Sequence, residues 1–189
     1  MTTIVAVKKN GIVSIAADTL TTFGNTRLHA SQDGSHDKIL HVGDSYIGVC
    51  GSAAHHLVLS SLLAKTADVK LTSKASIFET FRKLHPVLKE ECFLNPKEDE
   101  EDPYESSQIT ALIANATGIY GIYSMREVFE YTQFWAIGSG HEFALGAMHL
   151  AYKQSESAEN IARIGVEAGI AYDKNSAAPI TLYCVDLKY

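Results

Sequence analysis

The first apolar positions of the chain form two short stretches separated by a two-residue turn signal. Residues 3–7 and 12–16 are rich in β-branched side chains, and the dipeptide Asn10-Gly11 lies between them. Asn-Gly flanked by such stretches is the strongest short-range signal for a β-hairpin. If these two residues form the turn, Thr3 faces Asp18 across the hairpin. The pattern therefore predicts that the beginning of the chain lies beside Asp18.

The rest of the chain alternates groups of strands with pairs of helices. β-branched and aromatic stretches predict strands over residues 38–42, 46–50, 109–114, 119–123, 127–137 and 180–187. The spacing of apolar positions predicts helices over about 52–68, 73–91, 143–150 and 158–172, the second with a kink or an early end at Pro86. Residues 22–37 are polar and contain glycine, which predicts a loop. Hairpins dominate over βαβ units and no interdomain linker is evident, so we expect one α+β domain over residues 1–189.

Composition narrows the classes of protein that remain. The 189 residues are 46% hydrophobic and carry a formal net charge of -6. No apolar run approaches the roughly 20 residues of a membrane span, and the basic footprint of a nucleic-acid-binding protein is missing. The three cysteines lack CxxC spacing, and the first residues lack a secretory signal. We therefore expect a cytoplasmic protein without a membrane or nucleic-acid partner.

Candidates for cofactor binding and docking are few. The adjacent His55 and His56 begin a predicted helix and point about 100° apart, so they are not arranged to share one metal ion. No phosphate-binding glycine loop is present, so the chain is not itself an ATPase, and we expect neither a metal nor a cofactor. Residues 97–105 form an acidic run that predicts a solvated loop, with a docking surface as the alternative.

The second residue carries chemistry if the initiator methionine is removed. Thr2 follows Met1 directly, and a small second residue is the kind from which that methionine is normally trimmed. A free N-terminal threonine has both parts of a nucleophile and base pair, because its hydroxyl attacks and its own α-amino group accepts the proton. An α-amine titrates near ~7.7–8.0, close to a physiological working pH.

A series of short motifs carries a resemblance to a known family. In chain order they are Thr2 to Gly11, Ala16-Ala17-Asp18, Gly24-Asn25-Thr26, Lys38-Ile39, Cys50 to Ala54, Ala136 to Gly140, and Asp173 to Ser176. Together they resemble proteasome β-subunits and the bacterial HslV-type peptidase, which are N-terminal threonine peptidases. The N-terminal stretch is similar to HslV, whereas the Asp-x-x-Ser motif is similar to proteasome β-subunits. The small proteasome-like homologues of β-proteobacteria combine the two in this way.

The resemblance implies the fold and the reacting residues. It implies the four-layer αββα sandwich of N-terminal nucleophile hydrolases, with Thr2 as the nucleophile and Asp18 and Lys38 beside it. A lysine ammonium close to the threonine disfavours a second positive charge, so Lys38 lowers the pKa of the α-amine, and Asp18 orients the lysine. Gly51 corresponds to the glycine whose backbone N–H forms the oxyanion hole.

The resemblance also implies a supporting set and a substrate pocket. Ser139, Asp173 and Ser176 correspond to the residues that hold the α-amine and the threonine side chain in place. Thr21, Val49 and Ala53 correspond to the lining of the specificity pocket. None of these three is charged, so we expect a medium-sized apolar side chain before the scissile bond.

The resulting hypothesis is a self-compartmentalising threonine endopeptidase that cuts unfolded polypeptides through an acyl-enzyme on Thr2. The resemblance implies a homo-oligomeric double ring of fourteen subunits, with twelve as the alternative, and allows for a separate ATPase or other regulator. The segment 24–38 is longer than in the relatives and, like the acidic run, could contact such a partner. Two other functions remain open, namely a catalytically silent ring scaffold and an amidase that acts on a small molecule.

Overall fold

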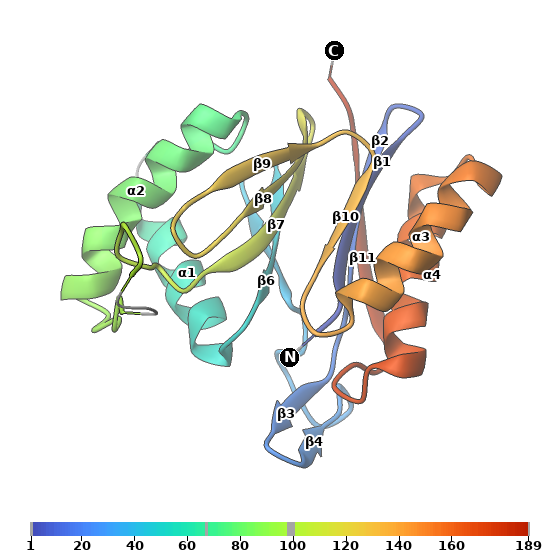
Figure 1. Ribbon diagram of the computed structural model, residues 1–189, viewed down its shortest axis with the longest axis horizontal. Helices are drawn as coiled ribbons and strands as arrows, with labels where there is room; N and C mark the ends of the chain where they lie inside the picture. The colour runs from blue at the N-terminus through green and yellow to red at the C-terminus, as the bar shows by residue number, and fades with distance from the viewer. Residues whose placement is uncertain (1, 67, 98–100, 189) are drawn as a thin grey trace.

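The computed structural model describes residues 2–66, 68–97 and 101–188. Two antiparallel sheets pack face to face, and a pair of helices covers the outer side of each (Figure 1). The predicted α+β class and the four-layer αββα arrangement are confirmed.

The first sheet has four strands and carries the start of the chain. Its strand order is β10 (Phe134–Ile137), β1 (Ile4–Lys9), β2 (Ile12–Asp18) and β11 (Ile180–Asp186). Helices α3 (His141–Gln154) and α4 (Ala158–Tyr172) cover its outer face. Small residues bring α4 close to the sheet, since a Cβ at Gly165 would lie 3.3 Å from a methyl group of Val5.

The second sheet has five strands in simple sequence order. They are β5 (Ile39–Val42), β6 (Ser45–Cys50), β7 (Thr110–Asn115), β8 (Gly118–Ile122) and β9 (Val128–Tyr131). Helices α1 (Ala53–Lys65) and α2 (Lys74–Glu90) lie on its outer face. Ser52 and Ser73 cap these helices as N-cap residues, and each accepts a hydrogen bond from a backbone N–H of the first turn.

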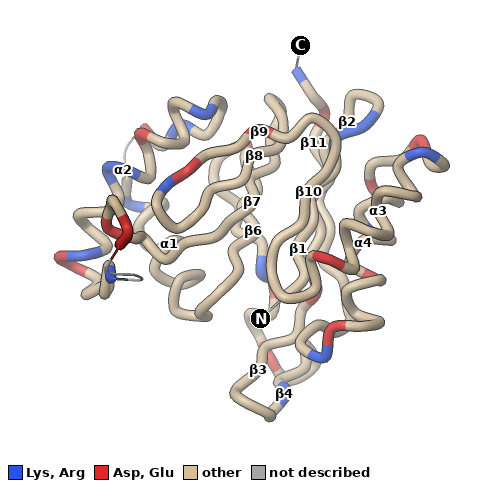
Figure 2. The backbone as a smooth tube through the Cα atoms, viewed as in Figure 1, with Lys and Arg blue, Asp and Glu red and all other residues tan. Residues whose placement is uncertain are grey.

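The layer between the sheets is apolar. Its buried residues come from both sheets and include Ile4, Val13, Ile15, Leu112 and Ile119. The sheets approach closely at Gly48, where a Cβ would lie 2.6 Å from a methyl group of Ile4. Charged residues lie mostly on the helices and turns around this layer (Figure 2). Among the described residues, no helix is long and apolar enough to span a membrane.

Three local expectations need correction. Residues 22–37 are not loop throughout, because β3 (Thr21–Phe23) and β4 (Thr26–Leu28) form a small hairpin around Gly24, whose φ of 58° suits a glycine turn. The predicted strand 127–137 is two strands, β9 and β10, which belong to different sheets. Helix α2 does not end early at Pro86 but continues to Glu90, so of the two predicted alternatives the early end is wrong.

The acidic run is only partly described. Residues 98–100 lie outside the described residues, and residues 101–105 form neither helix nor strand. Glu105, at the end of the run, accepts hydrogen bonds from Lys89 (2.5 Å) and binds His85 (3.1 Å), both on α2. The end of the run is thus attached to the outer helix layer.

Candidate active site

The first hairpin places Thr2 and Thr3 beside Asp18. Strands β1 and β2 pair with Ile4 opposite Ala17, which is the register predicted from the Asn-Gly turn. Asn10 and Gly11 both have positive φ, 50° and 80°, as a tight hairpin turn of this type requires. One position further on, the backbone N–H of Asp18 donates to the carbonyl of Thr3 (3.1 Å).

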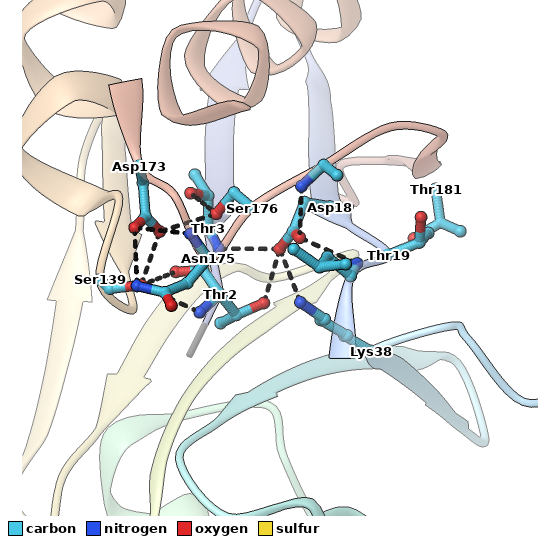
Figure 3. Close-up of polar contacts among 12 residues, drawn as sticks. Thr2, Thr3, Asp18, Thr19, Lys38, Ser139, Asp173, Asn175, Ser176 and Thr181 are labelled. Carbon is cyan, nitrogen blue, oxygen red and sulfur yellow. Dashed lines mark hydrogen bonds and ion pairs between the residues drawn. The ribbon is translucent and has the colours of Figure 1, made fainter. Parts of the chain in front are cut away.

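The Asp18 carboxylate is buried and connects the nucleophile candidate to the lysine. Its Oδ1 accepts from the hydroxyl of Thr2 (2.7 Å), the ammonium of Lys38 (2.8 Å) and the backbone N–H of Thr3 (2.9 Å). Its Oδ2 accepts from two backbone N–H groups, those of Leu20 (3.0 Å) and Ala177 (3.1 Å). Asp18 is 0% exposed. Figure 3 shows the carboxylate between the Thr2 hydroxyl and Lys38. Buried charge of this kind is stable only when it is paired and hydrogen-bonded, as here.

Lys38 comes from the other sheet and crosses to Asp18. It directly precedes β5, and its side chain is 14% exposed. Burial lowers the pKa of Lys38, and the neighbouring Asp18 carboxylate opposes that shift. The Lys38 to Asp18 contact therefore fixes a cation next to the Thr2 hydroxyl at the junction of the two sheets.

A second polar cluster lies on the opposite side of Thr2. Asp173 Oδ2 accepts from the hydroxyls of Ser139 (2.6 Å) and Ser176 (2.9 Å), and Asp173 Oδ1 accepts from the backbone and side-chain nitrogens of Asn175 (3.1 and 3.0 Å). Burial raises the pKa of Asp173, but the hydrogen bonds from Ser139, Asn175 and Ser176 together outweigh that effect and hold the pKa below its usual value. The cluster is therefore a carboxylate held in its charged form by fixed donors.

Ser139 connects this cluster to the nitrogen of Thr2. The Thr2 nitrogen donates to Ser139 Oγ (3.2 Å), and this nitrogen becomes the α-amine if Met1 is removed. The Thr3 hydroxyl lies 2.8 Å from that of Ser176. The structure thus brings six of the seven catalytic candidates, Thr2, Asp18, Lys38, Ser139, Asp173 and Ser176, into one connected network. Sequence reasoning did not single out Thr3 and Asn175, which complete it.

Three glycines form the slot that holds Thr2 and Thr3, the residues directly before β1. A Cβ at Gly138 would meet the Thr2 carbonyl, and one at Gly140 or Gly169 would meet the Thr3 hydroxyl. Gly138 also has a φ of 90°, which favours glycine. The backbone N–H of Gly140 donates to the Thr2 carbonyl (3.3 Å). These positions explain why glycine flanks Ser139 in the Gly-Ser-Gly motif.

A pocket of about 330 Å³ opens beside Thr2. Its lining includes Lys38, Gly51 and all three residues expected for the specificity pocket, namely Thr21, Val49 and Ala53. Gly51, the seventh catalytic candidate, has a φ of 111° and lies at the wall of this pocket, just before the N-cap of α1.

The pocket wall is more polar than the sequence indicated. Asp33, His36, Asp37 and His56 also line it, together with apolar side chains such as Leu20 and Leu57. Asp33, His36 and Asp37 were missed because they lie in a segment without a regular pattern of apolar positions. The path of that segment over the pocket depends on long-range contacts. Within residues 2–66, 68–97 and 101–188, no cluster of His, Cys, Asp or Glu is arranged to bind a metal ion.

Comparison with known proteins assigns the chain to a family. The family model described as Proteasome subunit matches residues 1–183. This chain belongs to the proteasome subunit family. A search of curated proteins gives no significant match to this proteasome-family chain.

Solved structures agree with that assignment. The structure of Thiobacillus denitrificans BPH in complex with epoxomicin is similar with a TM-score of 0.92 and 39% sequence identity, over 99% of this chain and 100% of that chain. A second structure of the same BPH has 40% identity and a TM-score of 0.92, covering 98% of each chain. HslV from Trypanosoma brucei, at 20% identity and a TM-score of 0.73, covers 97% of this chain and 99% of its own and shares the fold. The resemblance inferred from the sequence motifs is confirmed.

Proposed function

We propose that this proteasome-family chain is a threonine endopeptidase whose nucleophile is Thr2 after removal of Met1. The observation that carries the proposal is the meeting of the Thr2 hydroxyl and the Lys38 ammonium on one oxygen of buried Asp18, at distances of 2.7 and 2.8 Å, beside an open pocket. A nucleophile, a nearby cation and a substrate-sized cavity are the parts that acyl transfer needs.

In the proposed reaction the Thr2 Oγ attacks the carbonyl carbon of a peptide bond in the pocket. The free α-amine of Thr2 accepts the hydroxyl proton and passes it to the leaving amine, so the peptide C–N bond breaks and an ester to Thr2 remains. Water then attacks the ester, releases the second product and restores the hydroxyl. The charge that develops on the carbonyl oxygen is stabilised by the backbone N–H of Gly51, close to the start of α1.

The two polar clusters have different tasks in this proposal. Lys38 keeps the α-amine neutral by adding a positive charge near it, and Asp18 holds Lys38 in place. Ser139, supported by Asp173 and Ser176, orients the Thr2 nitrogen, which donates a 3.2 Å hydrogen bond to the Ser139 hydroxyl. The free α-amine would keep this hydrogen bond. Thr21, Val49 and Ala53 contact the side chain that precedes the scissile bond.

The proposed assembly is a homo-oligomeric double ring that encloses the active sites, with fourteen subunits favoured and twelve as the alternative. A ring requires a heterologous interface, in which two different surfaces of each subunit meet. Unfolded polypeptide in the cytoplasm is the proposed substrate, and a separate ATPase or other regulator would supply it.

Intact-mass measurement with and without epoxomicin tests the proposal. BPH from Thiobacillus denitrificans was solved in complex with this compound. We expect a subunit mass without Met1 and one covalent adduct per subunit, which peptide mapping locates on Thr2. Retention of Met1 without an adduct would contradict the proposal and favour the silent scaffold. Loss of Met1 with neither an adduct nor hydrolysis of fluorogenic peptides would favour an amidase for a small molecule.

A further inference from the structure

Asp37 joins the start of β5 to the last strand of the opposite sheet. Its Oδ1 accepts from the backbone N–H of Ile39 (2.9 Å) and from the hydroxyl of Thr181 (3.0 Å). Its Oδ2 accepts from the hydroxyl of Tyr183 (2.5 Å). The bond to Asp37, together with burial, raises the pKa of Tyr183 to about 12, so the phenol remains a donor at physiological pH. Asp37 therefore has three fixed donors, two of them on β11.

The strand that holds Asp37 is also the strand that flanks Asp18. Strand β11 pairs with β2, with Ile180 opposite Asp18 and Thr181 opposite Ala17. Asp37 directly precedes Lys38 in the chain. The residue before the lysine is thus fixed to the strand next to the carboxylate that the lysine must reach. Figure 3 shows Thr181 on the same side of the site as Asp18 and Lys38.

An aromatic stack reinforces this connection between the sheets. The rings of Tyr183 and Tyr46 are stacked with centroids 4.7 Å apart, and Tyr46 stacks on His41 at 4.6 Å. Tyr46 and His41 belong to β6 and β5, whereas Tyr183 belongs to β11. The ring of Tyr183 thus contacts one sheet while its hydroxyl holds the segment that leads into Lys38.

This connection matters because the ion pair of Lys38 and Asp18 spans two separate sheets. Asp18 ends β2 of the four-stranded sheet, and Lys38 precedes β5 of the five-stranded sheet. No backbone ladder joins these two strands, so their relative position depends on side-chain contacts. A small displacement of one sheet would change the 2.8 Å contact directly, and misplacement of a catalytic group by about 1 Å can cost roughly 100-fold in rate.

We propose that Asp37, held by Thr181 and Tyr183, is a positioning residue that sets Lys38 against Asp18 and so against the nucleophile. The inference rests on the proposed function for its effect on rate. Asp37 acts by holding the backbone from which the Lys38 side chain extends, and not as a charge in the pocket. The carboxylate does line the pocket, whereas Thr181 and Tyr183 do not, so variants at these two positions separate the two modes of action.

The test compares four variants in the assembled protein. Asp37→Ala removes all three contacts, and Asp37→Asn keeps an acceptor oxygen while removing the charge. The double variant Thr181→Val with Tyr183→Phe removes the hydroxyls that hold Asp37 but leaves the pocket carboxylate and the ring stack. Asp44→Ala removes an exposed carboxylate in the turn between β5 and β6 and is the control.

The expected result is a fall in kcat of roughly 10- to 100-fold for Asp37→Ala and for the double variant, with little change in KM. The acid limb of the kcat/KM profile moves to higher pH in both, because a displaced Lys38 no longer lowers the pKa of the α-amine. Asp37→Asn loses less than Asp37→Ala, and Asp44→Ala behaves like the wild type. Crystal structures of the wild type and Asp37→Ala should show the distance between Lys38 Nζ and Asp18 Oδ1 lengthened in the variant.

Two outcomes overturn the inference. One is a wild-type kcat and pH profile in the double variant, which would assign the effect of Asp37 to its charge in the pocket. The other is an unchanged contact between Lys38 and Asp18 in the Asp37→Ala structure. That structural comparison needs no activity, so it tests the positioning even if the wild type cleaves no peptide, in which case the proposed function alone fails.

Discussion

The polar network around Thr2 and the pocket beside it are built differently. In the network, which we call the nucleophile side, Asp18 is fully buried and Asp173 is 8% exposed, and both carboxylates accept hydrogen bonds from fixed donors. On the pocket side, Phe23 and Leu57 are 63% and 73% exposed. In the described part of the chain, the buried side-chain nitrogens without a hydrogen-bond partner, His55 Nδ1 and His56 Nε2, lie at the start of α1 on this side. The polar network around Thr2 is therefore buried and fully hydrogen-bonded, whereas the pocket side combines exposed apolar side chains with unpaired histidine nitrogens.

The two histidines at the start of α1 carry an energetic penalty that the nucleophile side avoids. Burial lowers the pKa of His55 and of His56, although Asp37 partly opposes the shift at His56. Both are therefore neutral side chains at pH 7, and a buried nitrogen without a partner carries a desolvation penalty. The nucleophile side has no such unpaired atom among the described residues.

The largest effect is expected from removing the nucleophile itself. Thr2→Ala should lower peptide hydrolysis by roughly 10³-fold or more, because the residue that carries the α-amine then has no hydroxyl to attack the substrate. Assembly should be unchanged, since the Thr2 side chain contributes one hydroxyl to a network whose other members remain. Fluorogenic peptide assays and size-exclusion chromatography measure the two quantities. Activity near the wild-type level in this variant would contradict the mechanism.

Loss of the cation should have the next largest effect. Lys38→Ala is expected to lower kcat/KM by roughly 100-fold or more at neutral pH, because the α-amine then holds its proton more tightly. The acid limb of the pH profile should move to higher pH. Lys38→Arg is the matched control, since it keeps the charge but not the compact geometry of an ammonium. An unchanged limb in Lys38→Ala would assign the lysine a purely structural task.

Asp173→Asn should weaken folding in a pH-dependent way. The native pKa of Asp173 lies below its usual value, so its stabilising contribution is present above the unfolded pKa of about 3.9 and is lost as the pH falls through the lower native pKa. At pH 7 the variant should lose about 1.5–3 kcal/mol, the range for hydrogen bonds to a charged group. Thermal or denaturant unfolding at pH 7 and below pH 4 measures it. A difference that persists unchanged in acid would contradict the assignment.

The smallest effect on stability is expected on the pocket side. Phe23→Ala, in the exposed β3 to β4 hairpin, should change the free energy of unfolding by at most about 0.5 kcal/mol, as for most surface positions. KM for peptides with a large apolar side chain before the scissile bond should rise, because Phe23 lines the pocket. Denaturant unfolding and a small peptide series check both. A large loss of stability would contradict this prediction and would show that the hairpin contributes to the packed core, as the nucleophile side does.

The features that the sequence predicts correctly are those that depend on short-range signals. The Asn-Gly turn determines the register of the first hairpin, and that register brings Thr2 to Asp18. Ser52 and Ser73 mark the helix starts through local hydrogen bonds. Such signals are short-range, so they can be interpreted without knowledge of the fold.

The predictions that failed concern features that depend on contacts between distant parts of the chain. Residues 127–137 have the composition of one strand throughout, and nothing local indicates that the chain leaves one sheet after Tyr131 and joins the other at Phe134. The sequence also gives no signal for the role of Asp37, because its partners Thr181 and Tyr183 lie more than 140 residues away in the chain. Contacts between layers are set by packing, which a periodic pattern does not encode.

The register of β11 also has a practical consequence for handling the protein. Ile180 lies opposite Asp18, whereas Asp186 lies opposite Ile12, next to the first turn. The two ends of this strand are therefore about 20 Å apart, at ~3.3 Å per residue, and the last strand leads away from Thr2 toward the opposite end of the sheet (Figure 1). An affinity tag or fluorescent fusion belongs after β11, because one placed before Thr2 would keep the Thr2 nitrogen in a peptide bond and so remove the α-amine that the proposed mechanism needs.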